Sequence, residues 1–225
     1  MQQPRDGRPW ALLIGTNMRT FIRIVAGNLR GRKVGCTVTE SLRPTPQMVR
    51  EAYFSIMGNA IPGRVFVDIF AGTGVMGIEA LSRGAAQTFF VERDLQLAKE
   101  IEENVRGFQL TRQSKLYRTD AYRWIAAWVA PKEPVSVFLS PPFADLSERT
   151  DVLLDAVRQL QAKVAEDSVI VVQTEYGSPL DKAEPLLGWE RRKYGRNELL
   201  IWQREITSAV PSAEPSASSE SVPSP

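Results

Sequence analysis

The segment Asp68-Ile-Phe-Ala-Gly-Thr-Gly74 constrains the fold more than any other part of the sequence. It ends a short apolar run and leads into a stretch with helical periodicity, which Gly84 closes. A strand that turns through glycines into a helix is a typical unit of a doubly wound α/β sheet. Ligands of such sheets bind beyond the carboxyl ends of the strands, so this turn predicts a cofactor site.

The rest of the chain repeats this alternation. Strands are expected at 65–69, 88–92, 115–118, 135–139 and 169–172, and helices at 75–83, 95–105, 121–129 and 151–164. Residues 189–194 and 199–204 are typical of an antiparallel hairpin. The sequence therefore predicts an α/β fold with a mostly parallel twisted sheet, helices on both faces and a C-terminal antiparallel hairpin.

A small strand-strand-helix extension is expected before this sheet. Its strands are predicted at 21–25 and 33–38, and Thr45 and Pro46 suit the N-cap and first position of a helix. The spacing of the apolar residues predicts one buried face, with Arg50 and Glu51 off it: Val49, Ala52, Tyr53, Ile56 and Met57. Such a unit is too small for its own core and should pack onto the sheet domain.

Four parts of the chain follow from these patterns. Residues 1–18 are expected to be a disordered or non-native leader, with Met18 a candidate true start. Residues 19–62 form the extension, residues 63–206 the sheet domain, and residues 207–225, rich in Ser, Pro and Ala, a disordered tail.

Composition excludes several kinds of catalytic and structural site. The chain has no histidine and a single cysteine, Cys36, which excludes a Ser-His-Asp triad, an HExxH zinc site and an internal disulfide. No apolar run approaches the roughly 20 residues that span a bilayer, and no signal peptide is evident. We expect a cytoplasmic, monomeric protein without a metal site.

The glycine turn also matches the dinucleotide fingerprint, since Gly72, Gly74 and Gly77 give GxGxxG. A pyrophosphate, however, would meet the carboxylate of Asp68. A cationic ligand without phosphate, such as S-adenosylmethionine, suits that carboxylate better. Glu92 can then accept the ribose hydroxyls and Asp120 the adenine amine, although Asp120 would also suit a helix N-cap.

Ser140-Pro-Pro-Phe143 follows the fourth predicted strand of the sheet domain. The Ser140 hydroxyl and the Pro141 carbonyl can accept hydrogen bonds from an amine of a nucleobase, and Pro142 adds no competing N–H donor. Phe143 offers a face on which an extruded base can stack. This turn therefore predicts a base site that faces a methyl donor.

Basic residues are unevenly distributed. Residues 19–50 contain seven basic residues and one acid, and a second cluster surrounds Tyr194. Such clusters are typical of phosphate contacts, and equally of a solvated surface.

These residues identify a family resemblance. The chain resembles the bacterial RsmD-type 16S rRNA guanine-N2 methyltransferases over about residues 19–205. The shared elements are Arg23-Ile-Val-Ala-Gly27, Leu29-Arg-Gly-Arg-Lys33, Leu42-Arg-Pro-Thr45, Val49-Arg-Glu51, Asp68 to Gly74, Gly77 to Arg83, and Val137 to Phe143.

The resemblance implies a Rossmann-like class I methyltransferase that uses S-adenosylmethionine to methylate N2 of a guanine in 16S rRNA or the small ribosomal subunit. The resemblance assigns the cofactor role to Asp68, Gly72, Gly74, Glu92 and Asp120. Their neighbours in these turns are expected in the same site, namely Phe70, Ala71, Thr73, Gly77, Arg93 and Ala121. The resemblance also places Arg43, Thr45 and Arg50 beside the site as RNA or cofactor contacts. The two basic clusters add further expected RNA contacts, namely Arg23, Arg30, Arg32, Lys33, Arg191, Arg192 and Lys193.

One position departs from the family pattern. The last motif usually begins with Asp, and this chain has Ser140, which resembles some DNA enzymes that methylate cytosine N4. Ser140 favours one alternative, an amino-methyltransferase that acts on cytosine N4 or adenine N6 of another RNA or DNA. Two further alternatives stay open: an inactive RNA-binding homologue and, last, an NAD dehydrogenase, which the GxGxxG match suggests.

Overall fold

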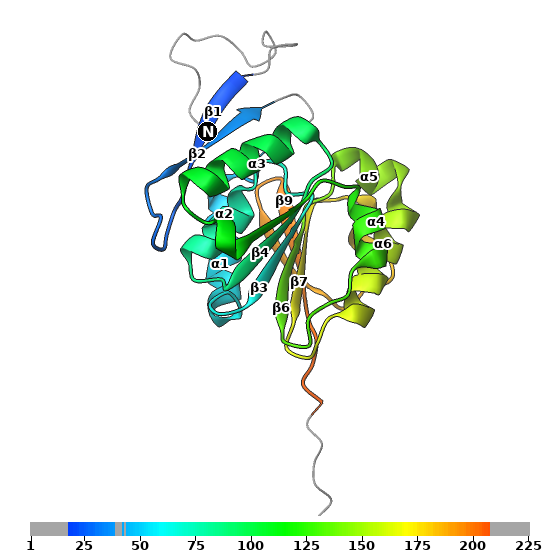
Figure 1. Cartoon of the computed structure of the whole chain (residues 1–225). Coiled ribbons are helices and arrows are strands. Elements are labelled where there is room, and N and C mark those ends of the chain that lie inside the picture. Colours follow the sequence, from blue (N-terminus) through cyan, green and yellow to red (C-terminus); the bar gives the residue numbers. More distant parts are fainter. Residues whose placement is uncertain (1–17, 39–41, 43, 208–225) are drawn as a thin grey trace, which may run out of the picture.

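The computed structural model describes residues 18–38, 42 and 44–207. Seven strands form one sheet in the order β5-β4-β3-β6-β7-β9-β8, and a separate antiparallel pair, β1-β2, lies beside it (Figure 1). The strands are β1 (Met18–Arg23), β2 (Lys33–Val38), β3 (Val65–Ile69), β4 (Gln87–Val91), β5 (Ser114–Tyr117), β6 (Val135–Leu139), β7 (Val169–Glu175), β8 (Glu190–Tyr194) and β9 (Asn197–Gln203). This is the Rossmann-like class I methyltransferase arrangement that the sequence predicts.

Helices cover both faces of the sheet (Figure 1). They are α1 (Gln47–Met57), α2 (Val75–Ser82), α3 (Leu95–Gly107), α4 (Ala121–Ala127), α5 (Phe143–Glu148) and α6 (Thr150–Lys163). Alternate residues of β3 enter opposite layers: Phe66 packs with α1, α2 and α3, whereas Val67 packs with α4 and α6. Burial on both faces explains why β3 and β6 are apolar almost throughout.

β3 and β6 are neighbours at the centre of the sheet, and they pair in parallel from Val65 with Val135 to Ile69 with Leu139. The chain winds outward from β3 to β4 and β5 on one side, and from β6 to β7 on the other. The point between β3 and β6 is therefore the topological switch point, where ligands of this fold class bind.

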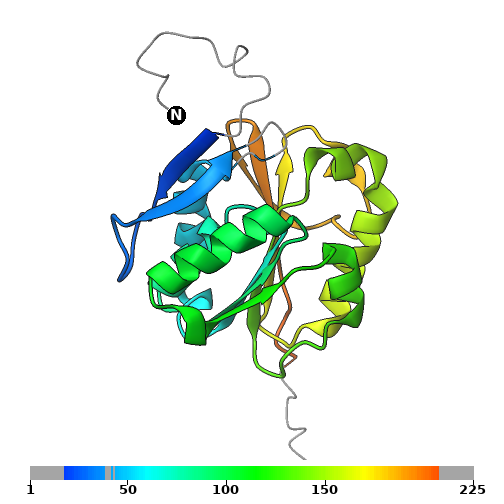
Figure 2. The ribbon, with the colours of Figure 1, turned by 45° about the horizontal axis from the view of Figure 1, so that its top comes forward.

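The N-terminal pair packs against the sheet domain through α3. The Asn104 side chain donates to the carbonyl of Gly35 at 2.7 Å and accepts from its N–H at 3.0 Å, and Glu100 accepts from the N–H and hydroxyl of Thr37 at 2.8 and 2.6 Å. Figure 2 shows β1 and β2 lying alongside α3. Ile24 and Val34 are buried in the same apolar cluster as α1 and the sheet. The extension is thus anchored by polar bonds and by a shared core.

The expectation for α1 was wrong in two respects. The helix begins at Gln47, its N-cap position is Pro46, and Thr45 makes no cap bond. Its buried face comprises Val49, Arg50, Tyr53, Phe54 and Met57, whereas Ile56 is exposed. The face is turned toward Arg50 because that guanidinium finds buried polar partners, as described below.

Three expectations from the sequence lie outside the described residues: the leader up to residue 17, the contact of Arg43, and the tail from residue 208. The short helix α5, directly after the Ser140-Pro-Pro turn, was not expected.

Candidate active site

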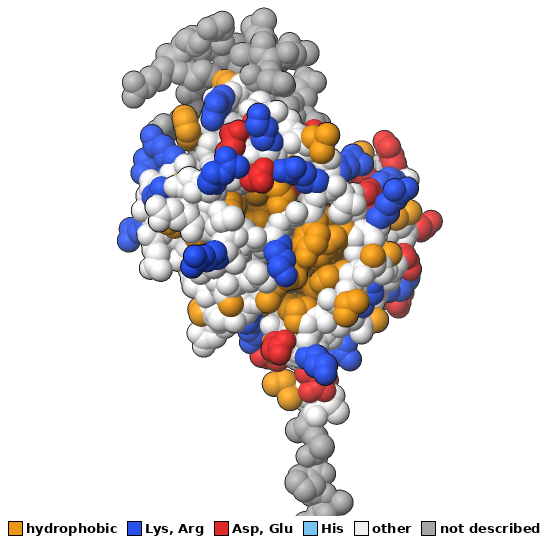
Figure 3. All heavy atoms as spheres, viewed as in Figure 1, with side chains coloured by type: hydrophobic (Ala, Val, Ile, Leu, Met, Phe, Trp, Pro, Cys, Tyr) orange, Lys and Arg blue, Asp and Glu red, His pale blue; other side chains and the backbone are white. Residues whose placement is uncertain are grey.

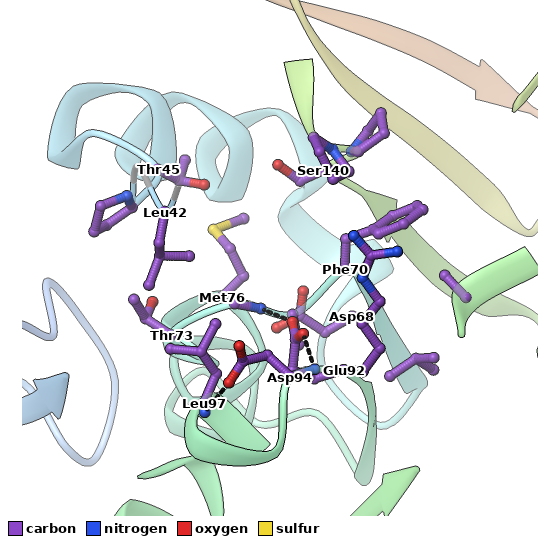
Figure 4. A pocket seen from close by; sticks show the side chains of 18 of the residues that line it. Leu42, Thr45, Asp68, Phe70, Thr73, Met76, Glu92, Asp94, Leu97 and Ser140 are labelled. Carbon is purple, nitrogen blue, oxygen red and sulfur yellow. Dashed lines mark hydrogen bonds between the residues drawn. The ribbon is translucent and has the colours of Figure 1, made fainter. Parts of the chain in front are cut away.

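A cleft of about 370 Å³ opens at the carboxyl ends of β3, β4, β6 and β7. Its walls bring together the glycine turn, the end of β4 and the Ser140-Pro-Pro-Phe143 turn. In Figure 4, Glu92 and Asp94 lie at one end of the cleft and Ser140 and Thr45 at the other. Two motifs that are some 70 positions apart in the sequence therefore share a single cavity.

The glycine turn closes tightly beneath this cleft. Gly72 and Gly74 have positive φ angles of 54° and 70°, and Phe70 also has a positive φ, of 60°. A Cβ at Gly74 would stand 2.8 Å from Cγ1 of Ile101, and one at Gly72 would stand 3.0 Å from Cδ1 of Leu42. Both positions need glycine for backbone conformation and for space.

Asp68 lies under the turn with a side chain that is 1% exposed. One carboxylate oxygen, Oδ2, accepts from the backbone N–H of Gly77 at 2.9 Å. Burial and, to a smaller extent, the charge of Glu92 raise the pKa of Asp68 to about 8, against the lowering effect of this N–H. A buried carboxylate on a cavity wall is suited to a cationic group.

The carboxylate of Glu92 is fixed at the end of β4. Its Oε2 accepts from the N–H of Gly72 and its Oε1 from the N–H of Asp94, each at 2.8 Å. Burial raises the pKa of Glu92, opposed by these same N–H groups. Each carboxylate oxygen can accept a second bond, so the pair can receive two adjacent hydroxyls such as those of a ribose.

The structure changes the interpretation of two expected cofactor residues. Asp120 caps α4, accepting from the N–H of Arg123 at 3.1 Å, and its neighbours Thr119 and Ala121 line the cleft instead. Gly77 lies against β4: a Cβ there would stand 2.2 Å from Cε1 of Phe90. Gly77 is therefore needed for close packing of α2 on the sheet, and it reaches the site only through its N–H to Asp68.

Most of the other expected residues line the cleft. They are Phe70, Ala71, Gly72, Thr73, Arg93, Ala121, Thr45, Ser140, Pro141, Pro142 and Phe143. Ser140 is half-buried, and its N–H donates to the carbonyl of Ile69 at 3.2 Å, which ties the turn to β3. Phe143 begins α5 and is 46% exposed, so its ring is accessible at the mouth of the cleft.

The base-site turn is braced by α4. Tyr122 donates its hydroxyl to Oδ2 of Asp145 on α5 at 2.6 Å, and the guanidinium of Arg149 lies 4.6 Å from the centre of the Tyr122 ring. The ring of Phe70 meets the same tyrosine edge to face, with centroids 5.5 Å apart. One side chain thus contacts both the glycine turn and the helix that carries Phe143.

Arg50 is a correction to the expected RNA contacts. It is 2% exposed and donates to the carbonyls of Thr45 at 2.8 Å and Arg23 at 3.0 Å. Its Nε lies 3.5 Å from Oε2 of Glu79, which is fully buried. Burial lowers the pKa of Arg50, opposed by Glu79. In this structure Arg50 holds the cleft wall in place and does not reach the surface.

The other basic residues remain at the surface. Arg23, Arg30, Arg32 and Lys33 are exposed on or beside the β1-β2 pair. Blue side chains gather over this pair and α3 in Figure 3. On the far edge of the sheet, Arg192 is exposed and pairs with Glu190, while Arg191 is half-buried and pairs with Glu198 at 3.2 Å. Lys193 lies 3.3 Å from the ring centre of Tyr176, which is 54% exposed.

Several lining residues were not expected from the sequence, namely Thr37, Leu42, Pro44, Val75, Met76, Asp94, Gln96, Leu97, Gln173 and Thr174. Asp94 and Leu97 follow the strand that ends at Val91, so their position after a parallel strand was a usable signal. Gln173 lies inside a strand, and only its register beside β6 brings it to the cleft.

The pH dependence of cofactor affinity follows from Asp68. Below its pKa of about 8 the carboxyl is mostly protonated, so binding of a cationic ligand must release a proton. Affinity for S-adenosylmethionine should rise toward pH 8 and weaken by up to about tenfold per unit as the pH falls from 7 to 5. Above pH 8 the ligand's own α-amino group loses its proton.

Isothermal titration calorimetry at several pH values, in buffers of different ionisation enthalpy, measures this release. The control ligand is 5′-methylthioadenosine, which has no ammonium group and should bind with little pH dependence. Equal pH profiles for the two ligands would contradict the assignment of Asp68 to the ammonium end.

The described part of the chain contains neither a membrane-spanning helix nor a cluster of metal ligands. No helix there is long and apolar enough to cross a membrane. Likewise, no group of three or more Cys, Asp or Glu side chains in that part is arranged to hold a metal ion.

Comparisons with known proteins agree with this geometry. The model of the family described as conserved hypothetical protein 95 matches residues 22–203. Ribosomal RNA small subunit methyltransferase D of Haemophilus influenzae is 32% identical over 172 residues, which are 73% of this chain and 84% of that protein. The Escherichia coli K12 protein of the same name is 29% identical over 187 residues, or 82% and 90% of the two chains.

Solved structures give the same fold. A Thermus thermophilus hypothetical protein superposes with a TM-score of 0.63 at 30% identity, over 82% of this chain and 99% of that one. A Thermus thermophilus 16S rRNA N2 methyltransferase, RsmC, in complex with AdoMet and guanosine, has a TM-score of 0.62 at 19% identity, over 84% and 50%. With a family model that matches most of its length, the chain belongs to the conserved hypothetical protein 95 family, that of the RsmD-type methyltransferases.

Proposed function

We propose that this protein transfers a methyl group from S-adenosylmethionine to the exocyclic N2 of a guanine in 16S rRNA of the small ribosomal subunit. The observation that carries the proposal is the single cleft shared by Asp68, Glu92 and the Ser140-Pro-Pro-Phe143 turn. The names of the relatives support an rRNA substrate.

The residues of the cofactor end fit S-adenosylmethionine. Asp68 offers a buried carboxylate to its ammonium group, and Glu92 offers two fixed oxygens to its ribose hydroxyls. Gly72 lines the cleft, and a Cβ there would stand 3.0 Å from Cδ1 of Leu42, another lining residue. When bound, the cofactor supplies an electrophilic methyl group on sulfur.

The residues of the other end orient the amine of the base. Ser140 and the Pro141 carbonyl accept hydrogen bonds from the amino group, which directs the nitrogen lone pair toward the methyl. Phe143 stacks on the extruded base. The chain has no histidine, and this mechanism needs none, because the amine can lose its proton to water after it is methylated.

RNA docks on the basic surface beside the cleft. Arg30, Arg32 and Lys33 are exposed there, and Phe21, whose ring centre lies 5.9 Å from Nζ of Lys33, is 61% exposed. Basic side chains with an exposed aromatic suit a phosphate backbone with an unpaired base.

The test offers labelled S-adenosylmethionine with unmodified small ribosomal subunits, free 16S rRNA and duplex DNA, followed by identification of the labelled nucleosides. We expect label as N2-methylguanosine from a ribosomal substrate. Label as N4-methylcytosine or N6-methyladenine would contradict guanine N2 as the target. It would support the second candidate function, an amino-methyltransferase for another base, which Ser140 favours. Absence of transfer together with thermal stabilisation by the cofactor would indicate an RNA-binding homologue.

Ser140→Asp provides a further test of the base site. A carboxylate accepts stronger hydrogen bonds than a hydroxyl and stabilises the positive charge that develops on the amine. The variant should therefore retain or raise the rate of single-turnover methyl transfer. A loss above about tenfold, roughly 1.4 kcal/mol in the barrier, would contradict the role given to Ser140.

A further inference from the structure

Gln173 lines the cleft, and its side chain bonds to Thr45, which lies with Ser140 at the end opposite Glu92 and Asp94 (Figure 4). It follows Val172, which pairs with Leu139 of β6, and Ser140 follows Leu139. Ser140, just after β6, and Gln173, inside β7, are therefore each one residue beyond the last paired residues of these two parallel strands, and both line the cleft. A carboxamide next to the predicted amine acceptor is well placed to meet the same base.

The Gln173 amide is held from both sides. Its Oε1 accepts from the hydroxyl of Thr45 at 3.0 Å, and its Nε2 donates to Oδ1 of Asn197 at 3.0 Å. Thr45 is nearly buried, and its carbonyl is fixed by Arg50, while Asn197 opens β9 opposite Glu175. These contacts use one of two lone pairs on the oxygen and one of two hydrogens on the nitrogen.

The chemistry of the bases gives this oxygen a purpose. The guanine amine N2 is flanked by N1–H, a donor. The amines of adenine and cytosine are flanked on their pairing edges by N1 and N3, which are acceptors. An acceptor beside the amine site therefore pairs with guanine and opposes a lone pair of the other two bases.

We propose that Gln173, positioned by Thr45 and Asn197, is the specificity-determining residue that selects guanine by accepting a hydrogen bond from N1–H. The inference rests on the proposed function and assigns the base selection to one side chain. It also accounts for guanine chemistry in a chain where Ser140 by itself would suit cytosine N4.

The test compares two mononucleotides that carry the same amine. Guanosine 5′-monophosphate has N1–H, whereas 2,6-diaminopurine riboside 5′-monophosphate has an unprotonated N1. Their dissociation constants are measured by NMR titration of the protein saturated with S-adenosylhomocysteine. Wild type should bind the guanine nucleotide about tenfold more tightly.

Gln173→Leu should bind the two nucleotides with about equal affinity. Gln173→Glu, which keeps an acceptor, should retain the preference for the guanine nucleotide. Gln113→Leu, an exposed glutamine at the opposite end of the sheet, should bind both nucleotides as wild type does. Unchanged preference in Gln173→Leu would overturn the inference. Equal affinity of wild type for the two nucleotides would also overturn it.

This experiment is independent of methyl transfer. Guanine preference in the nucleotide titration with no label on any ribosomal substrate would count against the proposed function alone. Transfer to guanine by wild type with unchanged preference in Gln173→Leu would count against Gln173 alone.

Discussion

Asp68→Asn is expected to weaken binding of S-adenosylmethionine about a hundredfold or more while leaving the protein folded. The carboxylate is 1% exposed, so its attraction to the ligand's ammonium group is little screened by water. Loss of one partner of a buried ion pair costs several kcal/mol, which corresponds to at least two orders of magnitude in affinity. Calorimetric titration at pH 8 measures the effect.

The thermal stability of the cofactor-free variant distinguishes a loss of cofactor affinity from unfolding. The folded protein holds the pKa of Asp68 near 8, far above its ordinary value of 3.8, so ionisation of Asp68 reduces stability as the pH rises from about 4 to 8. Asparagine removes this penalty and can still accept from the N–H of Gly77. The cofactor-free variant should melt no lower than wild type at pH 8. Asp155→Asn on α6 is the matched control, because the Asp155 side chain is exposed and accepts a hydrogen bond from the side chain of Gln159.

Arg50→Met is expected to lower the free energy of unfolding by about 3 kcal/mol. The substitution leaves Glu79 buried without its partner on α1 and leaves the carbonyls of Arg23 and Thr45 without their donor. Urea unfolding followed by far-UV circular dichroism measures the change. Methyl transfer should fall as well, because Thr45 lines the cleft.

Arg83→Met is the matched control, since Arg83 also pairs with Glu79, at 2.8 Å, but is partly exposed. Its cost should be about 1 kcal/mol, as for pairs near the surface. If Arg50→Met also lowered the free energy of unfolding by only about 1 kcal/mol, this would contradict the role of the buried guanidinium in holding the cleft wall in place.

The fold could be predicted because its signals are local and repeated. Apolar strands of four to seven residues alternate with amphipathic helices, so most elements were placed within a few residues of their bounds. The prediction failed at α1, where periodicity put Arg50 on the polar face. Glu79, a residue on α2 that no local pattern connects to Arg50, provides the buried partner that determines the face.

The residues of the candidate site likewise fall into two groups: those that a local motif predicts and those that depend on the tertiary fold. The turns of Asp68 to Gly74 and Ser140 to Phe143 were evident because each motif is contiguous. Asp120 was open to two interpretations, and the structure shows the helix cap. Gln173 could not be found, because its position depends on which strands are neighbours, and strand order is a property of the whole chain.

The insertion of β9 between β7 and β8 has a consequence for the timing of synthesis. β3, β4 and β6 carry the residues that would hold the cofactor and the amine, and all of them emerge from the ribosome before residue 144. Asn197, which accepts a hydrogen bond from the Gln173 amide, belongs to β9, the last strand of the sheet to be synthesised. The residues of the glycine turn and of the Ser140 turn are therefore synthesised early, whereas the Gln173 amide gains its Asn197 partner only when the final strand is in place.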